Sequence, residues 1–408
     1  MFGMSGKNIL FITLLRVNSI SDRGIYNDLL RNLQNKGNKI FVVSPLERRL
    51  KLKSNLTITE NSQILNIKTL NIQKTNLLEK GLATLVIEYQ YLFAIKKYFK
   101  EVKFDIIVYS TPPITFSKVI NYIKKRDSAF SYLLLKDIFP QNAIDLKLFR
   151  RNGLIHKFFL KKEKQLYVIS DYIGCMSQAN VDYIKKHNPN LDFNKILINP
   201  NSIYPNYTNY SLSDKESVKE KYQIPLDKKI FIYGGNLGKP QGLDFLLETI
   251  RLTKRYDVYF LIVGSGTELS RIKSWFKKNK PKNATLIPML TKIDYDNLLP
   301  ACDVGLIFLN KKFTIPNYPS RLLSYMEMKM PIIAATDKNS DIGMDIEKNK
   351  CGFGILSGDI KAMHNAINRL TDEVDLFNEM KENSWIFLNK DFHVDRSSKL
   401  IMQSINEK

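Results

Sequence analysis

Three segments in the second half of the chain combine a buried-strand pattern with residues that can hold a phosphate group. The first follows the apolar run 229–233 and contains Gly234, Gly235, Asn236 and Lys239. Glycines let the backbone approach a ligand closely, and a lysine side chain can reach a phosphate. The alternative interpretation is a tight turn between a strand and a helix that binds no ligand. A Walker loop is excluded, because the Gly-Lys-Ser/Thr ending is absent.

The other two segments repeat this combination. A second apolar run ends in Gly264-Ser265-Gly266, although the third glycine of a dinucleotide fingerprint is missing. The third segment places Pro319 and Ser320 at a predicted helix start, where free N–H groups and the positive helix end favour an anion. Arg321 adds a permanent charge with forked donors that suit a diphosphate. Alone, this segment could be a capped structural helix with a solvated arginine; together, the three predict a diphosphate site.

Polar residues follow two predicted strands in the first half. Arg16 comes directly after the first strand, and Ser19 and Tyr26 lie on the loop and helix start beyond it. Lys136 and Asp137 come after another apolar run. We expect these five residues to contact a ligand, with Asp137 accepting from a hydroxyl group. A solvated Arg16, and an Asp137 that only caps its loop, are the alternatives.

The elements that position these residues alternate along the whole chain. Short apolar runs are separated by segments with helical periodicity, and this alternation predicts right-handed crossovers, parallel sheets and helices on both faces. A polar, turn-rich connector near residues 200–210 indicates a domain boundary. We therefore predict an α/β protein with two doubly wound domains, 1–203 and 204–386, followed by a final helical segment, 387–408.

Composition narrows the class of protein. Sixty-two basic and forty acidic residues give a net charge of +22. Such an excess suits nucleic acid, an anionic membrane or phosphorylated ligands, or it reflects nucleotide bias in the source genome. The basic segments 48–53 and 150–162 could rest on a membrane leaflet or be solvated helix faces.

Other residue types point to a cytoplasmic protein without a metal. No run of eighteen apolar residues predicts a membrane span, and the apolar start of the chain favours a strand over a signal peptide. Three well-separated cysteines suggest free thiols, and the four histidines show no ligand spacing.

The order of these motifs resembles the retaining glycosyltransferases of family four. That family has the GT-B architecture, in which two Rossmann-like domains face each other across a cleft. The resemblance covers essentially the full length and is strongest in 233–242, 260–266, 287–309 and 316–335. The run 136–146 resembles a narrower branch of bacterial O-antigen and capsule transferases. That branch includes enzymes thought to move N-acetyl-L-fucosamine onto a lipid-linked sugar.

The resemblance implies a role for each candidate residue. Lys239 and Arg321 stabilise charge on the departing diphosphate, and Asp137 contacts a substrate hydroxyl, so these three are the expected catalytic residues. The expected donor-binding residues are Gly234, Gly235, Asn236, Lys239, Gly264, Met289, Leu290, Pro319, Ser320, Arg321 and Ser324, with Met289 and Leu290 beside the nucleobase. The expected acceptor-binding residues are Arg16, Ser19, Tyr26, Lys136 and Asp137. The segment 387–408 packs back on the first domain.

The chain departs from the family pattern at several of these positions. Asn236 and Gln241 stand where many members have an arginine and a lysine, and Lys136 replaces a histidine. Pro316 and Ser324 replace the paired glutamates, the second of which holds the ribose. A catalytically inactive relative is therefore an alternative.

We expect a metal-independent enzyme without a cofactor that takes a nucleotide sugar, expected to be a UDP-sugar, as its donor. The expected acceptor is a polyprenyl-diphosphate-linked saccharide, and the expected location is the inner face of the cell membrane, against its anionic surface. A basic nucleic-acid-binding protein is the alternative from another class. We expect no nucleic-acid partner, because no helix-turn-helix, RNP or zinc motif is present.

Overall fold

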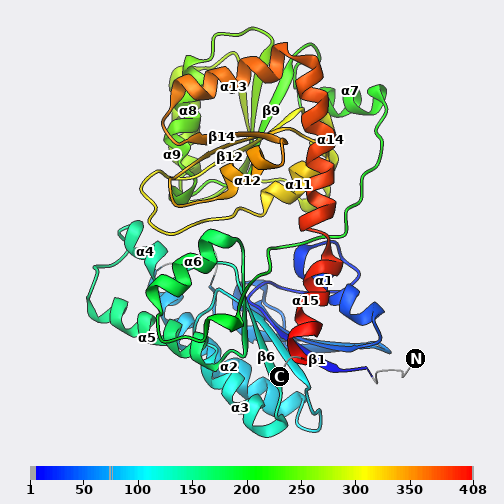
Figure 1. Cartoon of the computed structure of the whole chain (residues 1–408), viewed down its shortest axis with the longest axis vertical. Coiled ribbons are helices and arrows are strands. Elements are labelled where there is room, and N and C mark those ends of the chain that lie inside the picture. Colours follow the sequence, from blue (N-terminus) through cyan, green and yellow to red (C-terminus); the bar gives the residue numbers. More distant parts are fainter. Residues whose placement is uncertain (1–5, 73–74, 76, 407–408) are drawn as a thin grey trace. The chain divides into compact units, whose positions relative to one another are not determined.

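The computed structural model describes residues 6–72, 75 and 77–406, which form two compact units (Figure 1). The first unit comprises the chain up to Tyr204 together with Val394 onward, and the second is Pro205–His393. Helix α14 (Val374–Asp391) continues past residue 386, where the sequence placed the end of the second domain. Because the residues from Val394 onward belong to the first unit, that unit is built from two separate stretches of chain.

The first unit is built on an eight-stranded sheet with the order β3-β4-β2-β1-β5-β6-β7-β8. All neighbouring strands are parallel except β3 and β4. Most strands are buried on both faces, which explains their unbroken apolar runs. The strands are β1 (Asn8–Ile12), β2 (Lys39–Glu47), β3 (Asn55–Ile58), β4 (Ser62–Thr69), β5 (Ile106–Ser110), β6 (Phe130–Leu135), β7 (Tyr172–Cys175) and β8 (Ile196–Ile198).

Helices cover both faces of this sheet. Helix α1 (Ile25–Asn35) packs against α15 (Val394–Asn406), and Val394 and Ile401 of α15 belong to the same buried core as β1. Right-handed crossovers place α2 (Leu77–Tyr98), α3 (Ser117–Asp127) and α5 (Leu154–Ile169) on the other face. There α3 contacts both α2 and α5. The shorter helices are α4 (Gln141–Asp145) and α6 (Gln178–His187).

The second unit is built on a six-stranded, fully parallel sheet with the order β11-β10-β9-β12-β13-β14. The strand order reverses between β9 and β12, and ligands of such folds bind at this switch point, outside the carboxyl ends of the strands. The strands are β9 (Lys229–Asn236), β10 (Val258–Ser265), β11 (Ala284–Pro288), β12 (Val304–Phe308), β13 (Ile332–Thr336) and β14 (Gly352–Leu356). The prediction of two doubly wound α/β domains is confirmed.

The helices of the second unit connect these strands. They are α7 (Leu212–Lys221), α8 (Leu243–Leu252), α9 (Leu269–Asn279), α10 (Lys292–Leu298), α11 (Arg321–Glu327), α12 (Ile342–Lys348), α13 (Ile360–Asp372) and α14. The sequence predicted a helix from Pro319, whereas α11 begins at Arg321 with Ser320 as its N-cap residue. Within the described part of the chain, no helix has the length and hydropathy that a membrane crossing needs.

Candidate active site

Glycines at the carboxyl ends of the paired strands β9 and β10 allow close packing at this edge of the second sheet. Gly235 has a φ of 122°, a conformation that favours glycine. A Cβ atom at Gly264 would lie 1.9 Å from the Gly235 carbonyl oxygen, and one at Gly234 would lie 1.9 Å from the Tyr295 hydroxyl. Gly234 and Gly264 are buried, while Gly235 and Asn236 are exposed. Of these four predicted donor residues, Gly235 and Asn236 are therefore the two that are exposed to solvent.

Arg321 points into this edge of the sheet. Its Nη2 atom donates to Gln241 Oε1 at 2.7 Å, and its guanidinium carbon lies 4.4 Å from the centre of the Tyr233 ring. A Cβ atom at Gly235 would lie 3.5 Å from Nη2, so the guanidinium lies beside the glycine loop. The Nη1 atom is buried without a hydrogen-bond partner in the described structure. Arg321 is therefore not the solvated arginine of the alternative interpretation.

Two tyrosines that the sequence did not single out hold the glycine loop. The Tyr233 hydroxyl donates to the Asn236 carbonyl at 2.7 Å, and the Gly234 amide donates to the Tyr325 hydroxyl at 3.0 Å. Both tyrosines are fully buried. Tyr233 directly precedes the glycine pair, and that position was the one sequence signal that could have identified it.

Lys239 begins a short 3-10 turn, Lys239–Gln241, and its side chain is exposed. Its carbonyl accepts from Asn310 Nδ2 at 3.1 Å, which ties the turn to the end of β12. Met289 follows β11 and is 58% exposed, with its sulfur 3.2 Å from Ser265 Oγ; Leu290 beside it is half-buried. The predicted donor residues thus come from the carboxyl ends of β9, β10 and β11 and from α11.

Helix α11 is seven residues long, and Ser320 and Ser324 take different positions relative to it. Pro319 and Ser320 lie before its first turn, and Ser324 is half-buried within it. Glu327, one turn further along, is buried and accepts from the Asn206 amide at 2.8 Å. Glu327 thus has a structural contact, and it does not simply replace the glutamate missing at Ser324.

In the first unit, Lys136 and Asp137 follow β6, and hydrogen bonds from their backbone amides fix their position. Thr111 Oγ1 accepts from both amides, at 2.9 Å and 3.2 Å. Lys136 Nζ donates to the Asn199 carbonyl at 3.0 Å, and Asn142 Nδ2 donates to both Asp137 carboxylate oxygens at 3.0 Å and 2.9 Å. Burial lowers the pKa of Lys136 to about 7 and raises the pKa of Asp137 to about 6. Both groups therefore change charge near neutral pH.

The remaining predicted acceptor residues follow neighbouring strands. The Tyr26 hydroxyl bonds to Ser110 at the end of β5, and burial raises the Tyr26 pKa to about 12. Arg16 is exposed on the loop after β1, where Ser19 Oγ lies 2.6 Å from Ser21 Oγ. Because β1, β5 and β6 are adjacent, all five residues belong to one edge of the first sheet.

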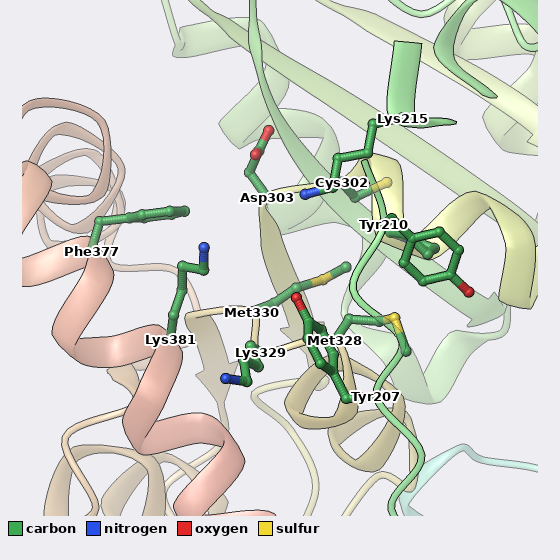
Figure 2. Close-up of a pocket in the computed structure, with 11 residues that line it drawn as sticks. Tyr207, Tyr210, Lys215, Cys302, Asp303, Met328, Lys329, Met330, Phe377 and Lys381 are labelled. Atoms are coloured by element: carbon green, nitrogen blue, oxygen red, sulfur yellow. The ribbon is translucent and has the colours of Figure 1, made fainter. Parts of the chain in front are cut away.

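A separate pocket of about 50 Å³ lies at the amino edge of the second sheet (Figure 2). Asp303 immediately precedes β12, and Met330 lies two residues before β13. Lys215 and Lys381 point toward the same space from α7 and α14. The lining residues are Tyr207, Tyr210, Lys215, Pro300, Cys302, Asp303, Met328, Lys329, Met330, Phe377 and Lys381. None of the predicted site residues lines it.

Acidic, histidine and cysteine side chains do not gather into a metal site: across residues 6–72, 75 and 77–406, no group of three or more could hold an ion. The Asp294–Asp296 pair, which imitates a metal motif, is part of a helix start. Thr291 is the N-cap of α10 and bonds to Asp294, and Asp296 pairs with Lys292 at 2.7 Å.

Comparisons with known proteins identify a family and relatives that this chain resembles. Residues 214–385 match the family described as group 1 glycosyl transferases. The chain is 21% identical over 313 residues to the probable glycosyltransferase WbjE of Pseudomonas aeruginosa, covering 74% of this chain and 73% of the relative. It is 23% identical over 198 residues to the putative colanic acid biosynthesis glycosyl transferase WcaI of Escherichia coli, covering 47% and 49%.

Solved structures are similar over nearly the whole chain. Sucrose-phosphate synthase from Thermosynechococcus elongatus superposes with a TM-score of 0.75 at 13% identity, covering 98% of both chains. Anabaena Alr3699/HepE in complex with UDP gives 0.70 at 13% identity, covering 98% of this chain and 100% of that one. The protein thus has the GT-B fold and is a glycosyltransferase, and its similarity to the group 1 glycosyl transferases covers residues 214–385 of the second unit.

Proposed function

We propose that this enzyme moves a sugar from a nucleoside diphosphate donor, a UDP-sugar, to a polyprenyl-diphosphate-linked saccharide during capsule or O-antigen synthesis. Transfer retains the anomeric configuration, needs no metal, and takes place at the inner face of the cell membrane. An N-acetylated amino sugar such as N-acetyl-L-fucosamine is the proposed group transferred. The relatives WbjE and WcaI, and the UDP bound to Alr3699/HepE, support this general assignment.

One observation carries the donor assignment: the Arg321 guanidinium lies beside the exposed Gly235 loop with its Nη1 atom unpartnered. A permanently charged group with a buried, unpartnered N–H donor is costly unless a ligand supplies an acceptor. The two phosphates of a nucleotide sugar supply that charge. Lys239, from the neighbouring turn, adds a second cation, and the backbone of Gly235 and Asn236 adds neutral contacts.

The same groups give the proposed chemistry. As the glycosidic oxygen leaves, negative charge grows on the diphosphate, and Arg321 and Lys239 stabilise it without needing a proton transfer. The leaving phosphate itself takes the proton from the acceptor hydroxyl. In the first unit, Asp137 accepts a hydrogen bond from a sugar hydroxyl when it is ionised, and Lys136, Tyr26, Ser19 and Arg16 contact the acceptor.

Thermal unfolding with UDP, dTDP, GDP and ADP tests the donor site. UDP at a hundred times its Kd should stabilise the protein by about 2.7 kcal/mol. Arg321→Ala should abolish the shift, whereas Arg251→Ala, an exposed arginine on α8, should preserve it. If no nucleotide moves the transition, the proposal fails. Addition of a chelator should leave both the shift and transfer unchanged.

An inactive nucleotide-binding protein is the second candidate. Ser324 stands where the resembled family has its ribose-binding glutamate, and the nearby Glu327 is engaged with Asn206. Such a protein would show the UDP shift but no release of UDP with any acceptor. A turnover assay with membrane lipid extract separates the two candidates.

A further inference from the structure

Helix α2 has two apolar faces, and only one of them contacts the core. Its inner face places Ala83, Ile87, Tyr91 and Ile95 in the protein interior at four-residue spacing. A helix that is apolar on both sides is normally buried on both sides. The outer face of α2 is instead in solvent.

The outer face forms a continuous stripe, which we call the α2 stripe: Leu82, Leu85, Tyr89 and Phe93. These side chains are 55%, 49%, 43% and 66% exposed, respectively. Their spacing of three, four and four residues puts them on one side of the helix. Scattered exposed leucines are ordinary, but an aligned row of four large apolar side chains marks a surface that binds something.

Helix α5, on the same side of the sheet, presents both apolar and basic side chains. Leu154 is 87% exposed and Val168 is 70% exposed. Lys157, Lys161 and Lys164 lie between them, and in the part of the chain that the structure describes no carboxylate pairs with any of the three. Lys157 and Lys161 belong to the predicted basic segment 150–162, and Lys164 lies just beyond it.

Helix α3 joins the two surfaces. Lys118 of α3 lies over the Tyr89 ring at 4.5 Å and donates to its hydroxyl. Between α3 and α5 runs an open groove of about 950 Å³ lined by Lys118, Lys157, Lys161, Lys164, Phe158 and Val168. The other predicted basic segment differs, because Arg48 and Arg49 pair with Glu79 and Glu47.

We propose that the outer face of α2, α3 and α5 docks on an anionic lipid bilayer. The α2 stripe and the exposed residues of α5 enter the interface between headgroups and acyl chains, and the lysines bind lipid phosphates. The charge of this face indicates which partner binds it, because unpaired lysines beside large apolar side chains match an anionic lipid surface. A second copy of this chain, with its own excess of positive charge, would repel them. The inference rests on the lipid-linked acceptor of the proposed function, and it assigns that membrane contact to specific helices.

Co-sedimentation of the full chain with lipid vesicles tests the docking surface. Wild type should bind vesicles of phosphatidylcholine mixed with phosphatidylglycerol and should bind phosphatidylcholine alone much more weakly, with the difference reduced by salt. Leu85→Asp with Phe93→Asp should weaken binding to mixed vesicles at least about tenfold. The matched control is Leu212→Asp with Tyr256→Asp, two side chains of the second unit that are 73% and 85% exposed. This control should bind as wild type does.

A second pair of variants tests the contribution of the lysines. Lys157→Glu, Lys161→Glu and Lys164→Glu together should abolish the preference for anionic vesicles, whereas Lys273→Glu, Lys277→Glu and Lys278→Glu on α9 make the same charge change and should retain it. Phe93→Trp should give a blue-shifted emission on mixed vesicles that Tyr256→Trp does not give. Circular dichroism melts verify that each variant is folded.

Three results would overturn the proposal. These are no binding of wild type to mixed vesicles, equal binding by the α2 stripe variant and its control, or self-association that Leu85→Asp and Phe93→Asp abolish. The proposed glycosyl transfer is judged separately. If docking alone is wrong, the UDP shift and turnover with a lipid extract persist in the stripe variant. If the donor site is wrong, vesicle binding persists without a UDP shift.

Discussion

The carboxyl edges of the two sheets carry their charges in different ways. At the first edge, burial moves Lys136 to a pKa of about 7 and Asp137 to a pKa of about 6. At the second edge the partly buried cation is an arginine, which keeps its proton at any pH at which the protein is folded. The charge at the first edge therefore depends on pH, whereas the positive charge at the second edge does not.

Removing the fixed charge should have the largest effect. Arg321→Ala should lower kcat/KM for transfer by on the order of 100-fold, or about 3 kcal/mol, because the variant loses a donor aimed at the developing charge. Steady-state kinetics across a pH series measures it, and the loss should be the same at each pH. A loss of kcat/KM seen only below or only above neutral pH would contradict the difference in pH dependence between the two edges.

Asp137→Asn should change stability in a pH-dependent way. A raised carboxyl pKa means that the native state favours the protonated form. The stability this group contributes is thus present below pH 4 and is lost as pH rises through about 6. The variant should gain up to about 3 kcal/mol relative to wild type between about pH 4 and pH 7. Denaturant titration at both ends of this range measures the gain, and a constant difference would show that Asp137 is not buried as described.

The close approach of strands β9 and β10 at the second edge predicts a purely structural loss. Gly264→Ala should destabilise the protein by about 1–3 kcal/mol, because the new Cβ atom meets the Gly235 carbonyl. Gly81→Ala is the control, since a Cβ atom there meets nothing within 4 Å. Denaturant midpoints compare the two, and a harmless Gly264→Ala would mean that the ends of β9 and β10 shift apart easily.

The smallest effect should come from Lys239, whose side chain is exposed. Lys239→Ala should weaken UDP binding by about 0.5–1 kcal/mol, and the difference should shrink as salt is added, whereas the contribution of Arg321 should persist. Isothermal titration at low and high ionic strength measures both. Equal salt sensitivity of the two variants would contradict the distinction between the partly buried Arg321 and the exposed Lys239.

Much of this architecture could be predicted from local sequence. Apolar runs that end in glycine, such as those before Gly234 and Gly264, identify strands of a parallel sheet, and strand–helix alternation fixes the direction of the crossovers. The inward direction of Arg321 could not be predicted, because it depends on Gln241 and Tyr233 from another part of the chain.

The two surfaces of α2 show the same limit. Periodicity indicates that Leu85 and Ile87 lie on different faces, but only the tertiary arrangement decides which face is covered. The tyrosines that hold the glycine loop were missed for a similar reason. Tyr325 contacts Gly234 across 91 positions of sequence.

Helix α15 has a consequence for the order in which this protein can fold. Its residues Val394 and Ile401 complete the core of the first unit, although nearly the whole second unit separates them from the rest of that core. During synthesis the main part of the first unit therefore leaves the ribosome without α15. The second unit is complete in sequence before α15 is made. We expect the second unit to reach its native packing first. Expression of residues 1–204 alone should yield an open, aggregation-prone domain.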